Sequence, residues 1–179
     1  MIIILNFGGQ YAHLIARRVR DFGVYSEILP CESPLDEIKK LKPNGIILSG
    51  GPSSVYETNS PTMDKRILEL GIPVLGICYG LQLIGKFVGG EVLGGKLKEF
   101  GKKMLHVKKN GKLLKGLSKK EQVWMSHGDL AAKLPGGFEI LASTDSCKIA
   151  AFENDMMRLY GVQFHPEVAH TLSGNKILN

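Results

Sequence analysis

The chain reads Pro-Val-Leu-Gly-Ile-Cys-Tyr-Gly-Leu-Gln-Leu-Ile-Gly at residues 73–85, and this stretch decides the fold. An apolar run at 72–77 predicts a short buried strand, and the residues after Gly80 are apolar at helical spacing. Gly76 and Gly80 bracket Cys78 with the glycine spacing of a nucleophile elbow, with a thiol in place of the usual hydroxyl. A strand that turns sharply into a helix strains its corner residue, and glycines on both sides leave room for the turn. We therefore expect Cys78 at the corner, where the helix N-terminus favours the thiolate.

Length and composition indicate a globular protein. The 179 residues, 44% of them hydrophobic, are enough for one domain over residues 1–179 with a sizeable core. No segment is long and apolar enough for a membrane span. Residues 1–6 are predicted to form a core strand rather than a signal peptide, so a cytoplasmic location without membrane contact is expected.

The three cysteines are Cys31, Cys78 and Cys147, and they are far apart in the sequence. An odd count without a C-x-x-C pair favours neither a disulfide framework nor a zinc site. Cys31 and Cys147 are predicted to be ordinary free thiols, and no metal is expected in this chain. Without its glycines, Cys78 would be interpreted in the same way, as a buried core residue.

The net charge of +6 comes largely from one stretch. Ten lysines fall between Lys96 and Lys120, with Glu99 as the only acid. A solvated surface is the simplest interpretation, and a docking surface for an acidic partner is the alternative. Nucleic-acid binding is not expected, because the stretch has no arginine and Phe100 is its only aromatic residue.

The hydrophobic pattern changes halfway along the chain. Strands are predicted at 2–7, 24–29, 45–48 and 72–77, and helices at 11–22, 34–41, 61–70 and 81–88. After Gly89 the pattern predicts short strands at 91–93, 105–108, 122–125, 139–142, 149–153 and 159–164. The predicted fold is therefore α/β: a mostly parallel, flavodoxin-like central sheet flanked by helices, with a β-rich C-terminal half.

Functional sites in such sheets form at the carboxyl ends of strands, and two further segments follow predicted strands. Gly50 and Gly51 precede Pro52 and Ser53 in a tight turn, whose N–H groups could form an oxyanion hole. Gly51 would supply one N–H and Tyr79, the residue after the cysteine, the other. A plain turn is the alternative.

The second segment ends in His165, Pro166 and Glu167. The proline keeps the backbone extended, so an imidazole and a carboxylate are held close together. A thiol nucleophile needs a base, and the base needs a third group to fix its tautomer. We therefore predict His165 as the base and Glu167 as its partner; the alternative is a structural histidine.

The segment Ser126-His127-Gly128-Asp129 follows a predicted strand. It could be a substrate loop, in which the backbone and Asp129 hold an α-amino group. It could equally be a turn with a helix cap.

Taken together, the motifs at 50–52, 76–82 and 162–167 resemble those of the class I (triad) glutamine amidotransferase family, in the same order and over nearly the whole chain. Residues 6–11, 46–56, 99–101 and 126–129 are similar to the branch of that family that serves GMP synthesis. The resemblance implies glutamine hydrolysis through a thioester on Cys78, with His165 as base and acid and Glu167 orienting it. It also implies an oxyanion hole of Gly51 and Tyr79, and glutamine contacts by these residues: Pro52, Ser53, Gln82, Ser126, His127, Gly128 and Asp129.

The resemblance further implies a partner. In this branch ammonia passes to an ATP-pyrophosphatase subunit that adenylates xanthosine monophosphate with ATP and aminates it. The chain has no S-G-G-x-D-S loop of such a synthetase, so ATP and magnesium are expected on the partner, with Lys96–Lys120 as part of the docking surface. Three alternatives remain open: another amidotransferase, such as that for anthranilate or carbamoyl phosphate; a γ-glutamyl hydrolase; and a non-catalytic binding module.

Overall fold

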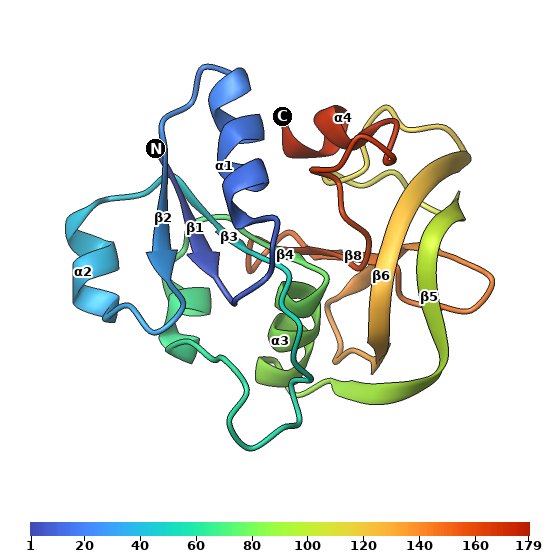
Figure 1. The fold of residues 1–179 in the computed structure, drawn as a ribbon, viewed down its shortest axis with the longest axis horizontal. Helices are drawn as coiled ribbons and strands as arrows, with labels where there is room; N and C mark the ends of the chain where they lie inside the picture. Colours follow the sequence, from blue (N-terminus) through green and yellow to red (C-terminus); the bar gives the residue numbers. More distant parts are fainter.

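Strands and helices alternate in the first half of the chain, as the hydrophobic pattern predicts. The computed structural model describes residues 1–94 and 98–179 (Figure 1). The first half contains β1 (Ile2–Asn6), α1 (Ala12–Asp21), β2 (Ser26–Pro30), α2 (Leu35–Lys40), β3 (Gly45–Leu48), β4 (Val74–Ile77) and α3 (Tyr79–Phe87). The second half contains β5 (Glu91–Val107), β6 (Lys120–Lys133), β7 (Glu139–Ser143), β8 (Ala151–Asn154), β9 (Leu159–Val162) and α4 (Gly174–Leu178). In the described residues no helix has the length and apolar character needed to span a membrane.

The nine strands form one sheet in the order β2-β1-β3-β4-β9-β8-β7-β5-β6. The neighbours from β2 to β9 are parallel, and every later pair is antiparallel. The predicted fold class, a parallel sheet with a β-rich C-terminal half, is thus confirmed. The pairing of β4 with β9 sets Ile77 beside Val162. Because these strands are parallel, the residues after them emerge side by side at one edge of the sheet.

Buried side chains cover both faces of the sheet. Successive side chains of a strand point to opposite faces, so each strand contributes to the core on both sides. Ile3 and Leu5 of β1 belong to one buried cluster with residues of α2 and α3. Ile4, between them, belongs to a second cluster with residues of α1 and α4. Figure 1 shows α1 and α4 close together at the top of the view, on the face of the sheet where Ile4 is buried.

The helix predicted at 61–70 is wrong for most of its length. Only a 3₁₀ turn at Lys65–Glu69 forms, and the Asp64 side chain caps it by accepting from the Arg66 N–H. The residues before it are held by tertiary contacts: Met63 is buried in the core, and the Pro61 carbonyl accepts a hydrogen bond from the Tyr79 hydroxyl. Proline at a helix start is therefore overridden here by packing.

The strands predicted at 91–93, 105–108 and 122–125 are parts of two long strands, β5 and β6, which form a curved ribbon at the right of Figure 1. In β5 the exposed side chains Lys98, Phe100 and Met104 alternate with the buried Glu99 and Leu105. Because lysine is a poor strand former, the sequence pattern did not predict a continuous strand here, although exposed and buried residues alternate. Of the lysine-rich stretch, Lys96 lies outside the described residues.

Candidate active site

Cys78 occupies the corner between β4 and α3. Its φ of +52° and ψ of −103° are rare for a residue with a side chain. The flanking glycines make this corner possible: a Cβ on Gly76 would lie 2.5 Å from the carbonyl carbon and oxygen of Gly80. A Cβ on Gly80 would lie 2.5 Å from the Leu48 carbonyl oxygen. The spacing in G-x-C-x-G therefore follows from close approaches of backbone to backbone.

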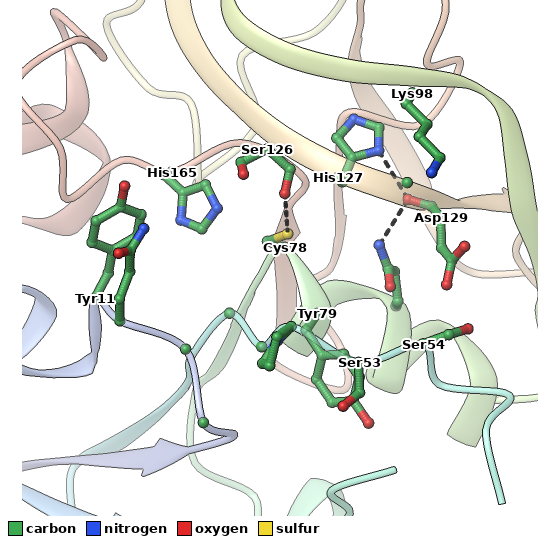
Figure 2. Close-up of a pocket in the computed structure, with 18 of the residues that line it drawn as sticks. Tyr11, Ser53, Ser54, Cys78, Tyr79, Lys98, Ser126, His127, Asp129 and His165 are labelled. Carbon is green, nitrogen blue, oxygen red and sulfur yellow. Dashed lines mark hydrogen bonds between the residues drawn. The ribbon is translucent and has the colours of Figure 1, made fainter.

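The imidazole and the carboxylate form a buried pair on the segment after β9. His165 Nδ1 lies 2.7 Å from Glu167 Oε1, and the two residues are 5% and 0% exposed. Gly50 adjoins both the ring and the cysteine, since a Cβ there would be 3.0 Å from His165 Cε1 and 3.7 Å from Cys78 Cβ. The Tyr11 and His165 rings pack in an edge-to-face arrangement, with centroids 5.2 Å apart. Figure 2 shows the His165 ring and the Cys78 sulfur lining the same cavity.

The environment of His165 favours its charged form. Burial lowers the pKa of the ring, but hydrogen bonding to Cys78 and to Glu167 outweighs it and raises the pKa to about 10. Glu167 Oε2 is buried with no hydrogen-bond partner among the described residues, so the His165 ring is the group that compensates this carboxylate. The Cys78 sulfur and the Glu167 carboxylate thus favour the imidazolium form of the ring at neutral pH.

We predict that Glu167→Gln lowers the pKa of His165 by about 1–2 units, because it removes an opposite charge while burial remains. The measurement is an NMR titration of the His165 ring, assigned with a His165→Asn variant. In the wild type the ring should stay protonated well above pH 6.5, and in the variant deprotonation should begin at lower pH. Equal midpoints in both proteins would show that the carboxylate does not control the ring.

A cavity of about 710 Å³ opens in front of the sulfur. Every predicted site residue except Glu167, which lies behind His165, lines it: Gly51, Pro52, Ser53, Cys78, Tyr79, Gln82, Ser126, His127, Gly128, Asp129 and His165. Segments that are distant in the sequence thus come together. The cavity also has a wall that sequence reasoning missed, formed by residues 8–11, Ser54, Glu57, Gly94, Lys98 and Phe100. The glycines after β1 were a usable signal, because they sit at a strand's carboxyl end as Gly50 does.

The two predicted oxyanion donors are neighbours. A Cβ on Gly51 would lie 3.3 Å from Tyr79 Cγ, so the two residues are in contact. Tyr79 is the first residue of α3, and the first N–H groups of a helix have no partner inside it. The arrangement therefore leaves backbone donors available at the edge of the cavity beside the sulfur.

Residues 126–129 do not form a loop or a capped turn. They lie within β6, where Ser126, His127 and Asp129 pair with Phe100, Glu99 and Gly94 of β5 respectively. The backbone carbonyl of Ser126 accepts from Cys78 Sγ at 3.6 Å, so β6 passes directly over the sulfur (Figure 2). Strand pairing fixes these backbone groups more firmly than a loop would.

Both ring nitrogens of His127 have hydrogen-bond partners within the protein, so neither is free to bind a ligand. Its Nδ1 lies 2.9 Å from the Asp129 carbonyl and its Nε2 lies 3.1 Å from Glu99 Oε2. Burial lowers the pKa of His127 and Glu99 offsets this in part. Because Nδ1 must donate to the carbonyl, one proton has to lie between Nε2 and the Glu99 carboxylate. The predicted glutamine contact of His127 can therefore involve only its backbone.

One group of possible metal ligands occurs in the described part of the chain: Glu99, His127 and Cys147, within 4.8 Å of one another. Glu99 already accepts from the hydroxyls of Thr144 and Ser146 at 2.8 and 2.6 Å. Burial raises the pKa of the Cys147 thiol to about 12. These donors are engaged or protonated, so the group fits a hydrogen-bond network behind the cavity better than a metal site.

Comparison with known proteins agrees with this geometry. The family model "Glutamine amidotransferase class-I" matches residues 3–179. The chain is 54% identical over 178 residues to the GMP synthase [glutamine-hydrolyzing] of Caldicellulosiruptor saccharolyticus, and 50% identical over 177 residues to that of Aquifex aeolicus. Each alignment covers 99% of this chain but 35% of the relative, so the chain spans about a third of the length of these proteins.

Solved structures show the same fold. A Thermoplasma acidophilum protein, provisionally described as one subunit of GMP synthase, superimposes with a TM-score of 0.88 at 34% identity, over 98% of this chain and 88% of that one. A Thermotoga maritima glutamine amidotransferase superimposes with a TM-score of 0.77 at 23% identity, over 97% of this chain and 79% of that one. With a family model that spans residues 3–179, the chain belongs to the class-I glutamine amidotransferase family.

Proposed function

We propose that this chain is the glutaminase part of GMP synthase, a single amidotransferase domain that hydrolyses L-glutamine to glutamate and ammonia. The observation that carries the proposal is the cavity in which the strained Cys78 corner meets the buried His165–Glu167 pair. A nucleophile, a base and an orienting carboxylate in one cavity are what acyl transfer requires. The relatives of about 50% identity that carry the GMP synthase name support the choice within the family.

The first half of the reaction forms a thioester. The Cys78 thiolate, whose proton His165 already holds, attacks the side-chain amide carbon of glutamine, and the carbonyl oxygen becomes an oxyanion held by the N–H groups of Gly51 and Tyr79. His165, protonated at neutral pH, gives its proton to the leaving nitrogen. The C–N bond breaks, ammonia leaves and the acyl group stays on sulfur.

The second half returns the enzyme to its starting state. The now neutral His165 takes a proton from water, whose oxygen attacks the thioester carbon, and the thiolate leaves as glutamate forms. Glu167 accepts from Nδ1 throughout, so the other ring nitrogen is the one that exchanges protons.

Substrate binding would use the wall formed by β6 and α3. In this proposal the Asp129 carboxylate and the backbone of Ser126 and Gly128 hold the α-amino end, and Pro52 and Ser53, which line the same cavity, also contact glutamine. Gln82 donates from Nε2 to the Asp129 carbonyl and to Gln163 Oε1. Both hydrogens of its amide are therefore used, and Gln82 can offer a ligand only its carbonyl oxygen.

The ammonia would pass to an ATP-pyrophosphatase part that carries ATP and magnesium and converts xanthosine monophosphate to GMP. The relatives are about three times as long as this chain, which leaves room for such a part in them. The deciding experiment is an ammonia assay on the purified chain, with and without the synthetase, ATP, magnesium and xanthosine monophosphate. We expect low activity alone and strong stimulation by the full set. Stimulation by a different acceptor would indicate another amidotransferase, and cleavage of γ-glutamyl peptides would indicate a hydrolase.

We propose the lysine-rich ribbon, Lys98 to Lys120 in the described residues, as part of the docking surface. Replacing the exposed Lys102, Lys115 and Lys119 with glutamate should weaken binding of the synthetase about tenfold or more at low salt, and should reduce the dependence of affinity on salt. The measurement is titration calorimetry at two ionic strengths. The matched control reverses Lys39, Lys40 and Lys42, at and just beyond α2, and should bind as the wild type does; equal losses in both triple variants would contradict this docking surface.

A further inference from the structure

Gln163 is fully buried between the substrate wall and the sulfur, and the mechanism above gives it no role. It lies just after β9, two residues before His165, and is 0% exposed. Its Nε2 is 3.6 Å from Cys78 Sγ, and its Oε1 is 3.3 Å from Gln82 Nε2. Gln82 Nε2 in turn donates to the Asp129 carbonyl at 2.8 Å. The three residues form a continuous hydrogen-bond chain from the substrate wall to the nucleophile.

The Asp129 carbonyl, at one end of this series of hydrogen bonds, determines which atom donates and which accepts in each bond. A backbone carbonyl can only accept, so the atom of Gln82 that faces Asp129 must be the nitrogen. That same nitrogen faces Gln163, so the Gln163 atom opposite it must be the oxygen. The remaining end of the Gln163 amide, its N–H, is therefore the end that points at Cys78.

We propose that Gln163 is a further catalytic residue, whose side-chain N–H donates a hydrogen bond to Cys78 Sγ and stabilises the thiolate. Gln82 and the Asp129 carbonyl act as positioning groups that keep the amide from turning over. The role in catalysis rests on the proposed glutaminase function, whereas the effect on the sulfur does not.

The Ser126 carbonyl beside the sulfur gives a second donor a role alongside His165. Cys78 is 4% exposed, so little water reaches it. The Ser126 carbonyl at 3.6 Å is an acceptor, which favours the S–H form over the thiolate. The N–H of Gln163 opposes this preference, because it donates a hydrogen bond that is stronger to the charged sulfur than to the neutral thiol.

Other titratable groups also surround the sulfur, and a test has to hold them constant. The ionisable side chains of the cavity, of the segment behind it and of the neighbouring core include these: Tyr11, Glu57, Tyr79, Lys98, Glu99, His127, Asp129, Cys147, His165 and Glu167. Gln163 is uncharged at every pH, so its replacement by an uncharged residue leaves all of these charges in place. Gln163→Met is the change of choice, since it keeps the length of the side chain and removes the N–H donor.

The experiment measures the alkylation rate of Cys78 by iodoacetamide between pH 5 and 10 in the 179-residue chain, with the labelled peptide identified by mass spectrometry. Peptide identification separates Cys78 from Cys31 and Cys147, whose pKa values burial raises to about 12. In Gln163→Met the midpoint of the alkylation profile should move to higher pH, and at pH values below that midpoint alkylation should become about tenfold slower. The kcat for glutamine should fall by a similar factor, with KM little changed. An unchanged pH profile in a folded variant would overturn the proposal.

Gln82→Met tests the orientation of the amide and serves if Gln163→Met fails to fold. Without the Gln82 donor the Gln163 amide can turn, so the midpoint should shift in the same direction by a smaller amount. If the alkylation midpoint of Gln82→Met equals that of the wild type, the proposed role of Gln82 in orienting the Gln163 amide is wrong. If glutamine is not hydrolysed at all but both midpoints shift, the proposed function fails while the assignment of Gln163 to the sulfur holds.

Discussion

Replacing Cys78 with serine is expected to reduce the release of ammonia from glutamine by about 10⁴-fold or more, which is the largest effect on activity that the structure predicts. The sulfur is the atom that would carry the acyl group, and among the described residues no second nucleophilic side chain of the cavity occupies the corner beside His165. A serine hydroxyl in this geometry would keep the shape but not the acidity of the thiol, so it would not form the charged nucleophile that pairs with the imidazolium. The measurement is a coupled glutamate assay with the stimulated complex, together with mass spectrometry for an adduct of a glutamine-like electrophile.

Cys31→Ala is the matched control, because Cys31 is likewise buried and free but does not line the cavity. It should retain activity within about twofold once folding is verified, and the electrophile should still modify position 78. Substantial hydrolysis by Cys78→Ser, or an adduct on Cys31 or Cys147 instead, would remove the thioester mechanism.

The sequence was most informative where a local pattern has one geometric solution. The glycines at 76 and 80 predicted the strand-to-helix corner because two close backbone contacts require them. The parallel order of the first strands followed from their alternation with helices. By contrast, the stretch at 61–70 has helix signals but forms mostly extended chain, because burying Met63 and bonding the Pro61 carbonyl outweigh local preference.

Features of the site that depend on which strands pair could not be predicted from the sequence. Residues 126–129 were recognised as a candidate, but that they lie inside a strand depends on β5, whose partner positions are about 30 residues away. Glu99 looked like a lone acid among lysines, yet it is buried and holds His127, Thr144 and Ser146. The position of Gln163 against the sulfur depends on the side-by-side placement of β4 and β9, which no local pattern reveals.

Gly80→Ala is expected to destabilise the protein by about 3 kcal/mol or more. Alanine normally stabilises a helix over glycine by about 1 kcal/mol, so the sign here is opposite to the rule. The reason is contact: the new Cβ would lie 2.5 Å from the Leu48 carbonyl oxygen and 2.6 Å from Leu48 Cβ. Leu48 lies in β3 between β1 and β4 and cannot move without disturbing the sheet, so α3 and the Cys78 corner would have to shift.

Gly85→Ala in the same helix is the control that isolates this cause. Its Cβ would meet Val92 Cγ2 at 3.7 Å and Leu134 Cδ2 at 3.8 Å, which are ordinary van der Waals distances. We therefore expect Gly85→Ala to be neutral or to stabilise the protein by up to about 1 kcal/mol in urea unfolding, because helix propensity then decides. Similar free energies of unfolding for the two variants would mean that the corner is not held by the contact of α3 with β3. The strained geometry at Cys78 would then need another source of support.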